Sequence, residues 1–97
     1  MTMPLYRKKP VVIEAWQWNG RLDVKPDWLI VAANDPKESV VIVGTGCVVR
    51  QRDKLLIGTL EGTMTASLTD WIIRGVKGEI YPCRKDIFES TYEKVED

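Results

Sequence analysis

Basic side chains fall into short local groups along this chain, and indole rings lie among them. The basic groups are Arg7-Lys8-Lys9, Arg50-Arg52-Lys54, Arg74-Lys77 and Arg84-Lys85, and the indoles are Trp16, Trp18, Trp28 and Trp71. Guanidinium groups suit planar contacts with phosphate or carboxylate, and aromatic faces can stack on a nucleobase. This combination predicts a site for a small anionic ligand such as a nucleotide. The candidate ligand-binding residues are Arg7, Lys8, Trp16, Trp18, Arg74, Lys77, Tyr81 and Arg84.

Each of these residue types also has a structural use. Lysine at a strand edge discourages pairing between the sheets of different molecules. An aromatic side chain buries roughly 150–250 Å², so the tryptophans can equally build the core of a small domain. The alternative interpretation is therefore a set of solvated strand edges around a tryptophan-rich core.

Catalysis is disfavoured because the chain contains no histidine. Its absence removes the usual general base near neutral pH and the commonest metal ligand. Acid–base work would fall to carboxylates such as Glu14, Glu61, Asp70 and Glu79. The Gly44-Thr45-Gly46 stretch lacks the Gly-Lys-Ser/Thr ending of a phosphate-binding loop. We therefore assign no catalytic residue, no metal ligand and no cofactor.

The overall composition is that of an ordinary globular chain. Its 97 residues are 44% hydrophobic and 29% charged, with a net charge of zero. This length predicts a single domain over residues 1–97, and the balanced charge disfavours a nucleic-acid polymer as partner. No apolar run approaches the ~18 residues of a membrane span. Cys47 and Cys83 form no Cys-x-x-Cys pair, so we expect reduced thiols and a cytoplasmic location.

The apolar pattern predicts mostly short strands. An extended segment over 6–18 is followed by a helix over 23–35, where the spacing of Trp28, Leu29, Val31 and Ala32 is helical. Strands are then expected over 40–43, 47–51, 54–60, 63–67, 70–74 and 78–83, and a short helical turn within 84–95 capped by Asp86. The pattern predicts an α+β fold: a curved, barrel-like antiparallel meander with one main helix and a short C-terminal helical turn. The fold of 35–54 stays open.

Turn residues separate these predicted strands. Gly62, Asp70, Gly75 and Gly78 are assigned to turns, with Gly75 and Gly78 supplying positive φ angles. Asp70 can accept backbone N–H groups within its own turn. These residues form hairpins whatever the function of the protein.

The stretch TLEGTMTASLTDWIIRGVKGEIYPCRKDIFESTYE (59–93) resembles small phage and prophage proteins of the PGDYG type. Their pattern runs Thr-Leu-Glu-Gly, Pro-Gly-Asp-Tyr/Trp-Ile-Ile, Gly-Val-Lys-Gly-Glu, Tyr-Pro and Phe-x-x-Thr-Tyr-Glu. The segment YRKKPVVIEAWQW (6–18) resembles the start of the same proteins. Leu68-Thr69 stands where the family has Pro-Gly, and a threonine would be strained in a turn that needs positive φ at position 69. The resemblance implies a phage origin and an accessory role.

Three functions remain open. The first is a phage accessory protein that binds without catalysis and interferes with a host defence process, by capturing a nucleotide signal between the subunits of a homo-oligomer. The second is a protein–protein interaction module that contacts a host or phage protein. The third is a small metal-dependent nucleotide hydrolase that uses Asp70, Glu61 or Glu79.

Overall fold

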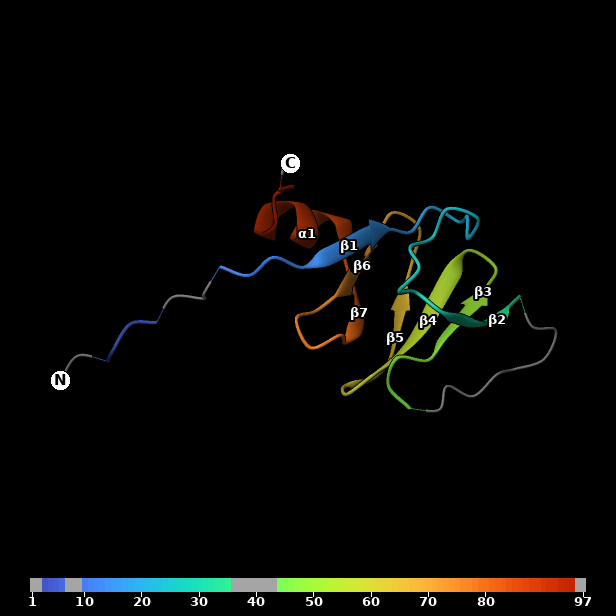
Figure 1. The fold of residues 1–97 in the computed structure, drawn as a ribbon, viewed down its shortest axis with the longest axis horizontal. Coiled ribbons are helices and arrows are strands. Elements are labelled where there is room, and N and C mark those ends of the chain that lie inside the picture. The colour runs from blue at the N-terminus through green and yellow to red at the C-terminus, as the bar shows by residue number, and fades with distance from the viewer. Residues whose placement is uncertain (1–2, 7–9, 36–43, 96–97) are drawn as a thin grey trace.

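The computed structural model describes residues 3–6, 10–35 and 44–95 (Figure 1). Its elements, in chain order, are β1 (Glu14–Gln17), β2 (Val31–Asn34), β3 (Val48–Gln51), β4 (Lys54–Thr59), β5 (Gly62–Ala66), β6 (Trp71–Arg74), β7 (Ile80–Cys83) and α1 (Lys85–Thr91). The predicted α+β class is confirmed, with strands dominating and one short helix. The predicted strand over 40–43, like Arg7 and Lys8, lies outside the described residues.

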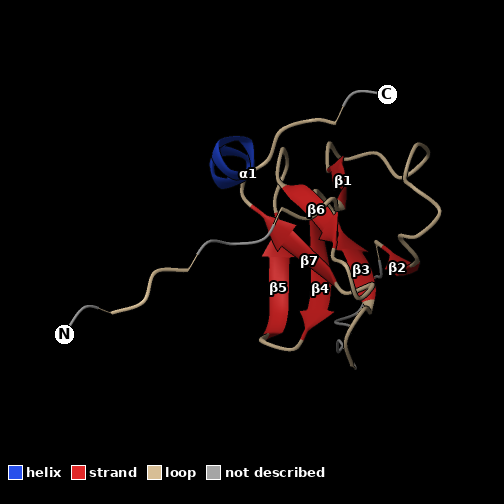
Figure 2. Ribbon diagram, turned by 60° about the vertical axis from the view of Figure 1, so that its left-hand side comes forward, coloured by secondary structure: helices blue, strands red, loops and turns tan. Residues whose placement is uncertain are grey.

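The strands form two sheets that do not close into a barrel. One sheet has the order β1-β6-β7 and the other has the order β2-β3-β4-β5. Every strand pair is antiparallel except β2 with β3, which is parallel. Antiparallel pairing of successive strands is therefore confirmed for β3-β4-β5 and for β6-β7, but β5 and β6 lie in different sheets. Strand β7 contacts β4 and β5 of the other sheet (Figure 2).

The main helix predicted over 23–35 is wrong, because this segment holds isolated turns and strand β2. Leu29 N–H bonds the carbonyl of Pro26, but no continuous helical ladder follows. The apolar run is too short to stabilise a helix in isolation. Burial of Leu29 and the pairing of β2 with β3 instead favour a turn followed by a strand. Asp35 takes a φ of 51° just before Pro36, which ends the strand.

The core lies between the two sheets and is built by residues from both. Trp18 and Ile72 come from the β1 and β6 side, and Leu55 and Ile57 come from β4. All four are fully buried. Trp16 and Trp28 pack against this cluster while half-buried, so the structural interpretation of the tryptophans holds for these three rings.

The C-terminal helical turn is confirmed as α1, but its predicted cap is wrong. Arg84 is the N-cap residue and makes no side-chain cap bond. Asp86 lies in the first turn and accepts a hydrogen bond from Arg84 Nη2 at 3.2 Å. A carboxylate there favours the helix through its charge near the amino end and not through a capping bond.

The turn glycines differ in what they contribute. Gly62 and Gly78 have positive φ angles of 103° and 84°, whereas Gly75 has no positive φ. A side chain at Gly75 would instead collide with the carboxyl group of Glu79, which accepts the Lys77 N–H. The expectation of positive φ is thus confirmed at Gly78 and wrong at Gly75, where close packing accounts for the glycine.

The turn between β5 and β6 holds a strained threonine. Asp70 N–H bonds the Ser67 carbonyl at 3.0 Å, and Asp70 Oδ2 accepts the Ser67 N–H at 3.0 Å. Thr69, the third residue of this turn, has a φ of 77°. Positive φ at that position is the type II pattern, for which Pro-Gly is the favoured central pair. Asp70 therefore has its predicted turn role, and Thr69 occupies a position suited to glycine.

Replacing Thr69 by glycine is expected to raise the free energy of unfolding. Relief of about 1–3 kcal/mol of backbone strain outweighs the roughly 0.5–1 kcal/mol lost to the flexibility of glycine in the unfolded chain. Chemical denaturation should show the gain. Thr65→Gly in β5, where φ is not positive, is the matched control and should be destabilising. A loss of stability in Thr69→Gly would contradict the assignment of strain.

Candidate functional site

Most predicted ligand-binding residues are already engaged within the chain. Trp18 is fully buried and unavailable for stacking on a ligand, and Trp16 lies beside it with ring centroids 5.8 Å apart. Arg74 pairs across strands with Glu14 at 3.1 Å, and Arg84 pairs with Asp86 at 3.2 Å. The remaining two are Lys77, in the exposed β6–β7 turn, and Tyr81 on β7. The structure therefore does not gather the described candidates into one cationic site.

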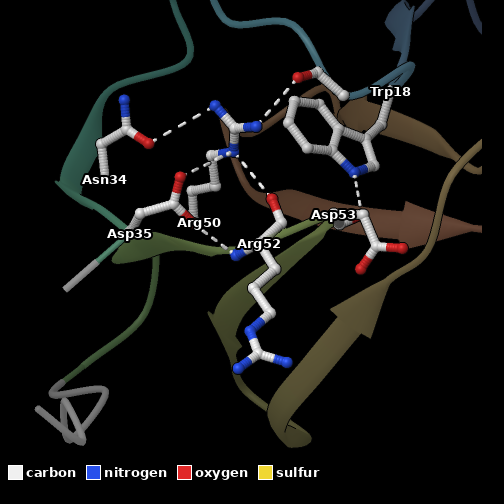
Figure 3. Close-up of polar contacts among 7 residues, drawn as sticks. Trp18, Asn34, Asp35, Arg50, Arg52 and Asp53 are labelled. Atoms are coloured by element: carbon white, nitrogen blue, oxygen red, sulfur yellow. Dashed lines mark hydrogen bonds and ion pairs between the residues drawn. The ribbon is translucent and has the colours of Figure 1, made fainter. Parts of the chain in front are cut away.

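Arg50, another cation of the predicted basic groups, acts as a structural clasp (Figure 3). Its Nε donates to the Arg52 carbonyl at 2.8 Å, and its Nη2 donates to the Gly20 carbonyl at 3.1 Å. Nη1 reaches Asn34 Oδ1 at 3.5 Å, and Nε lies 3.7 Å from Asp35 Oδ2. The guanidinium thus joins the end of β2, the β3–β4 turn and the loop after β1, with its planar fork filled by protein oxygens.

Two adjoining pockets lie where the segment 10–13 meets the β6–β7 hairpin and the end of α1. Pocket A encloses about 550 Å³ and pocket B about 440 Å³. These volumes fall in the range of ligand sites. Pocket A is lined by residues including Val11, Val76, Glu79, Tyr81, Tyr92 and Glu93. Pocket B shares Val11, Tyr92 and Glu93 and adds Trp71, Phe88 and Lys94.

Stacked aromatic rings form one wall of pocket B. Trp71 and Phe88 have centroids 4.3 Å apart at an interplanar angle of 12°, and Phe88 and Tyr92 are 5.0 Å apart at 28°. Phe88 and Tyr92 are four residues apart and share one side of α1 and its end. No residue of α1 is fully buried. The stacking of Phe88 on Trp71 is therefore the main described contact between α1 and β6.

The indole N–H of Trp71 is a buried donor without an acceptor among the residues that the structure describes. Leaving such a donor unmatched costs about 1–3 kcal/mol. Trp71 is among the residues that line pocket B, but its indole nitrogen is itself buried from solvent.

Two ionisable groups on β7, Tyr81 and Cys83, favour their neutral forms. Burial, followed by a hydrogen bond with Tyr92 and the charge of Glu79, raises the pKa of Tyr81 to about 12. Burial, followed by the charges of Asp70 and Asp86, raises the pKa of the Cys83 thiol. A thiol held protonated is a poor nucleophile, so Cys83 acts as a half-buried packing residue.

Stability is expected to fall as the pH rises from about 10 to about 12. The folded state holds the Tyr81 proton more tightly than an unfolded tyrosine, whose pKa is 10. Its contribution is therefore complete below the unfolded pKa and is lost as the pH passes the folded pKa. Urea unfolding across this window should show the decline, and Tyr81→Phe should reduce it. An equal decline in both proteins would contradict the assignment.

The carboxylates considered for catalysis have separate local roles. Asp70 accepts the Ser67 N–H, Glu79 accepts the Lys77 N–H, and Glu14 pairs with Arg74. Within residues 3–6, 10–35 and 44–95, no three histidine, cysteine, aspartate or glutamate side chains are grouped as a metal site would need.

Most pocket residues were missed by sequence reasoning. Among the predicted binding residues that the structure describes, Tyr81 alone lines pocket A. Trp71 was considered only as a ring that could stack on a base or build the core, and Val76, Glu93 and Val95 carried no signal. The available clue was the spacing of Phe88 and Tyr92 on a short helix, which placed two rings on one face.

No helix in the described part of the chain is long and apolar enough to cross a membrane. Comparison with family models, curated protein sequences and solved structures finds no match for this chain.

Proposed function

We propose that this protein is a binding module without catalytic activity, and that pockets A and B hold an extended polypeptide segment. The observation that carries the proposal is the aromatic wall that Trp71, Phe88 and Tyr92 form along pocket B, with Tyr92 also lining the adjoining pocket A. Aliphatic residues and flat rings suit the alternating side chains of an extended peptide.

The charges near the pockets favour a basic polypeptide over a nucleotide. Glu79 and Glu93 line pocket A, and Lys94 is the one cation among the described lining residues of both pockets. Phosphates would meet these carboxylates at a cost, whereas lysine or arginine beside an apolar stretch would be attracted. Arg74 and Arg84, which were candidates for phosphate, are paired internally.

The biological setting that we propose is that of a phage accessory protein acting on a host process in the host cytoplasm. The resemblance of 6–18 and 59–93 to PGDYG-type proteins supports the phage origin. The two free cysteines suit a reducing compartment. A site that binds a polypeptide segment would allow a small protein to act by binding to a partner protein.

Selection from a displayed library of short random peptides tests the proposal. Selected peptides should carry an apolar stretch flanked by lysine or arginine. Val76→Lys places a charge in the wall of pocket A at a side chain that is 67% exposed, so folding is preserved. We expect it to weaken peptide binding about 10- to 100-fold in fluorescence polarisation.

Ile30→Lys is the matched control, because Ile30 is 75% exposed and lines neither pocket. It should bind the selected peptides as the wild type does. Equal binding by Val76→Lys, or failure to select any peptide, would contradict the proposal. Calorimetric heat with nucleotides that Val76→Lys leaves intact would favour a nucleotide site elsewhere on the protein.

A further inference from the structure

We propose that the polypeptide held by the pockets is the N-terminal arm, residues 3–6, of a second copy of this chain. Each protomer of a two-fold dimer would place its arm in the pockets of its partner. This inference rests on the proposed function, because it names the occupant of the same pockets.

The arm is a dense group of uncovered apolar side chains. Met3 is 84% exposed, Leu5 is 97% exposed and Tyr6 is 91% exposed. Three large apolar side chains within four residues give an exposed apolar surface of the kind that marks an interaction site. The described part of the protomer does not cover them. Figure 1 shows the blue N-terminal end lying away from both sheets and from α1.

The arm leaves the domain at the wall of the pockets. Residues 10–13 line pocket A, and three of them also line pocket B. The arm therefore cannot turn back into these pockets without reversing at this wall. An extended chain gains about 3.3 Å per residue, so residues 3–6 can instead reach roughly 23–33 Å beyond residue 13. A second protomer placed within this reach can receive the arm in its own pockets.

Because each arm starts beside the pockets of its own protomer, two protomers can exchange their arms within a closed dimer. In a two-fold dimer each surface meets its counterpart on the partner, and the assembly stops at two chains. An arm whose base lay far from the pockets would instead favour open chains of molecules. The proximity of arm base and pocket wall thus favours a dimer.

Charge complementarity also favours this occupant. The sequence that follows the arm is Arg7-Lys8-Lys9, and the pocket lining of the partner would present Glu79 and Glu93. An apolar group next to three cations matches an apolar pocket that carries carboxylates. The arm therefore has the same chemistry that the pockets select.

Sedimentation velocity of the full chain tests the exchange. The wild type should sediment as a dimer of the 11.1 kDa chain. An arm variant, Met3→Ser/Leu5→Ser/Tyr6→Ser, and the pocket variant Val76→Lys should each raise the dimer dissociation constant about 30-fold or more. The control Leu60→Lys, at a side chain 93% exposed and outside both pockets, should remain a dimer.

Mixing the two defective proteins separates arm exchange from other modes of dimerisation. The pocket variant retains a sound arm and the arm variant retains sound pockets, so the mixture should form heterodimers more tightly than either forms homodimers. A monomeric wild type, or an arm variant that still dimerises, would overturn the inference. If the wild type is monomeric yet library peptides bind and Val76→Lys weakens them, the exchange fails while the proposed function stands.

Discussion

Replacing Trp18 by alanine is expected to lower the free energy of unfolding by about 3–5 kcal/mol. Trp18 is fully buried in the cluster shared by the two sheets. Its indole N–H donates to the Asp53 carbonyl at 2.8 Å, so the substitution leaves both a cavity and an unmatched acceptor. Since a domain of this kind has roughly 5–15 kcal/mol of stability in total, the variant should be largely unfolded at modest urea concentrations.

Two further variants separate the parts of this effect. Trp18→Phe keeps an aromatic ring but removes the donor, and we expect a loss of about 1–3 kcal/mol. Tyr6→Ala removes a ring that is 91% exposed and should change stability by less than about 0.5 kcal/mol when measured on dilute protein. A Trp18→Ala variant as stable as Tyr6→Ala would show that Trp18 is not part of the core.

Replacing Arg50 by methionine is expected to lower the free energy of unfolding by about 2–3 kcal/mol. The substitution leaves the carbonyls of Arg52 and Gly20 without their charged donor. The Asp35 contact adds little, because that carboxylate side chain is 49% exposed and screened by water. Arg50→Lys should recover only part of the loss, since an ammonium group cannot reproduce the planar fork.

Arg21→Met is the matched control for Arg50. Arg21 bonds Asp23 through two contacts of 3.1 and 2.6 Å, yet both side chains are more than half exposed. Such surface pairs contribute about 0–1 kcal/mol, so urea unfolding should show a small change. Equal losses for the two arginines would mean that the Arg50 contacts are no more stabilising than a surface pair.

Trp18 and Arg50 are also coupled to each other. The Arg50 guanidinium carbon lies 5.6 Å from the centroid of the Trp18 ring, within the range of cation–π contact. Neighbouring residues of one network do not give additive effects. The Trp18→Ala/Arg50→Met double variant should therefore lose less stability than the sum of the single variants.

The strand meander was predictable because its signals are local. Short β-branched runs separated by Gly62 and Gly78 place the turns of β4–β5 and β6–β7 whatever the remainder of the chain does. The Ser67–Asp70 turn followed from the side-chain acceptor of Asp70. In each case a few neighbouring residues determine the geometry.

The error over 23–35 shows where local patterns fail. Trp28, Leu29 and Val31 have helical spacing, but a short apolar run fits a turn followed by a strand equally well. The choice depended on a partner strand, because Val31 pairs with Val48 in a parallel register. A tertiary contact of this kind leaves no trace in the 23–35 segment itself.

The candidate site was less predictable because exposure depends on the whole fold. Leu5 and Leu29 are the same residue type, yet one is 97% exposed and the other is fully buried. The grouping of arginines in the sequence also did not indicate that Arg50 would donate its hydrogen bonds to backbone carbonyls. Nor did it indicate that Arg74 would form an ion pair across strands. The sequence indicated which residue types suit binding, but it did not indicate which residues would line the pockets.

Whether pockets A and B hold a polypeptide is tested most directly by the indole N–H signals in a two-dimensional ¹H–¹⁵N spectrum. The arm variant would be titrated with a synthetic peptide of residues 1–13, and Trp71→Phe would assign the Trp71 signal. The proposal predicts that the Trp71 indole signal moves in a saturable manner while that of Trp18, bonded to Asp53 in the core, stays in place. A Trp71 signal that does not respond, or equal movement of all the indole signals, would contradict it.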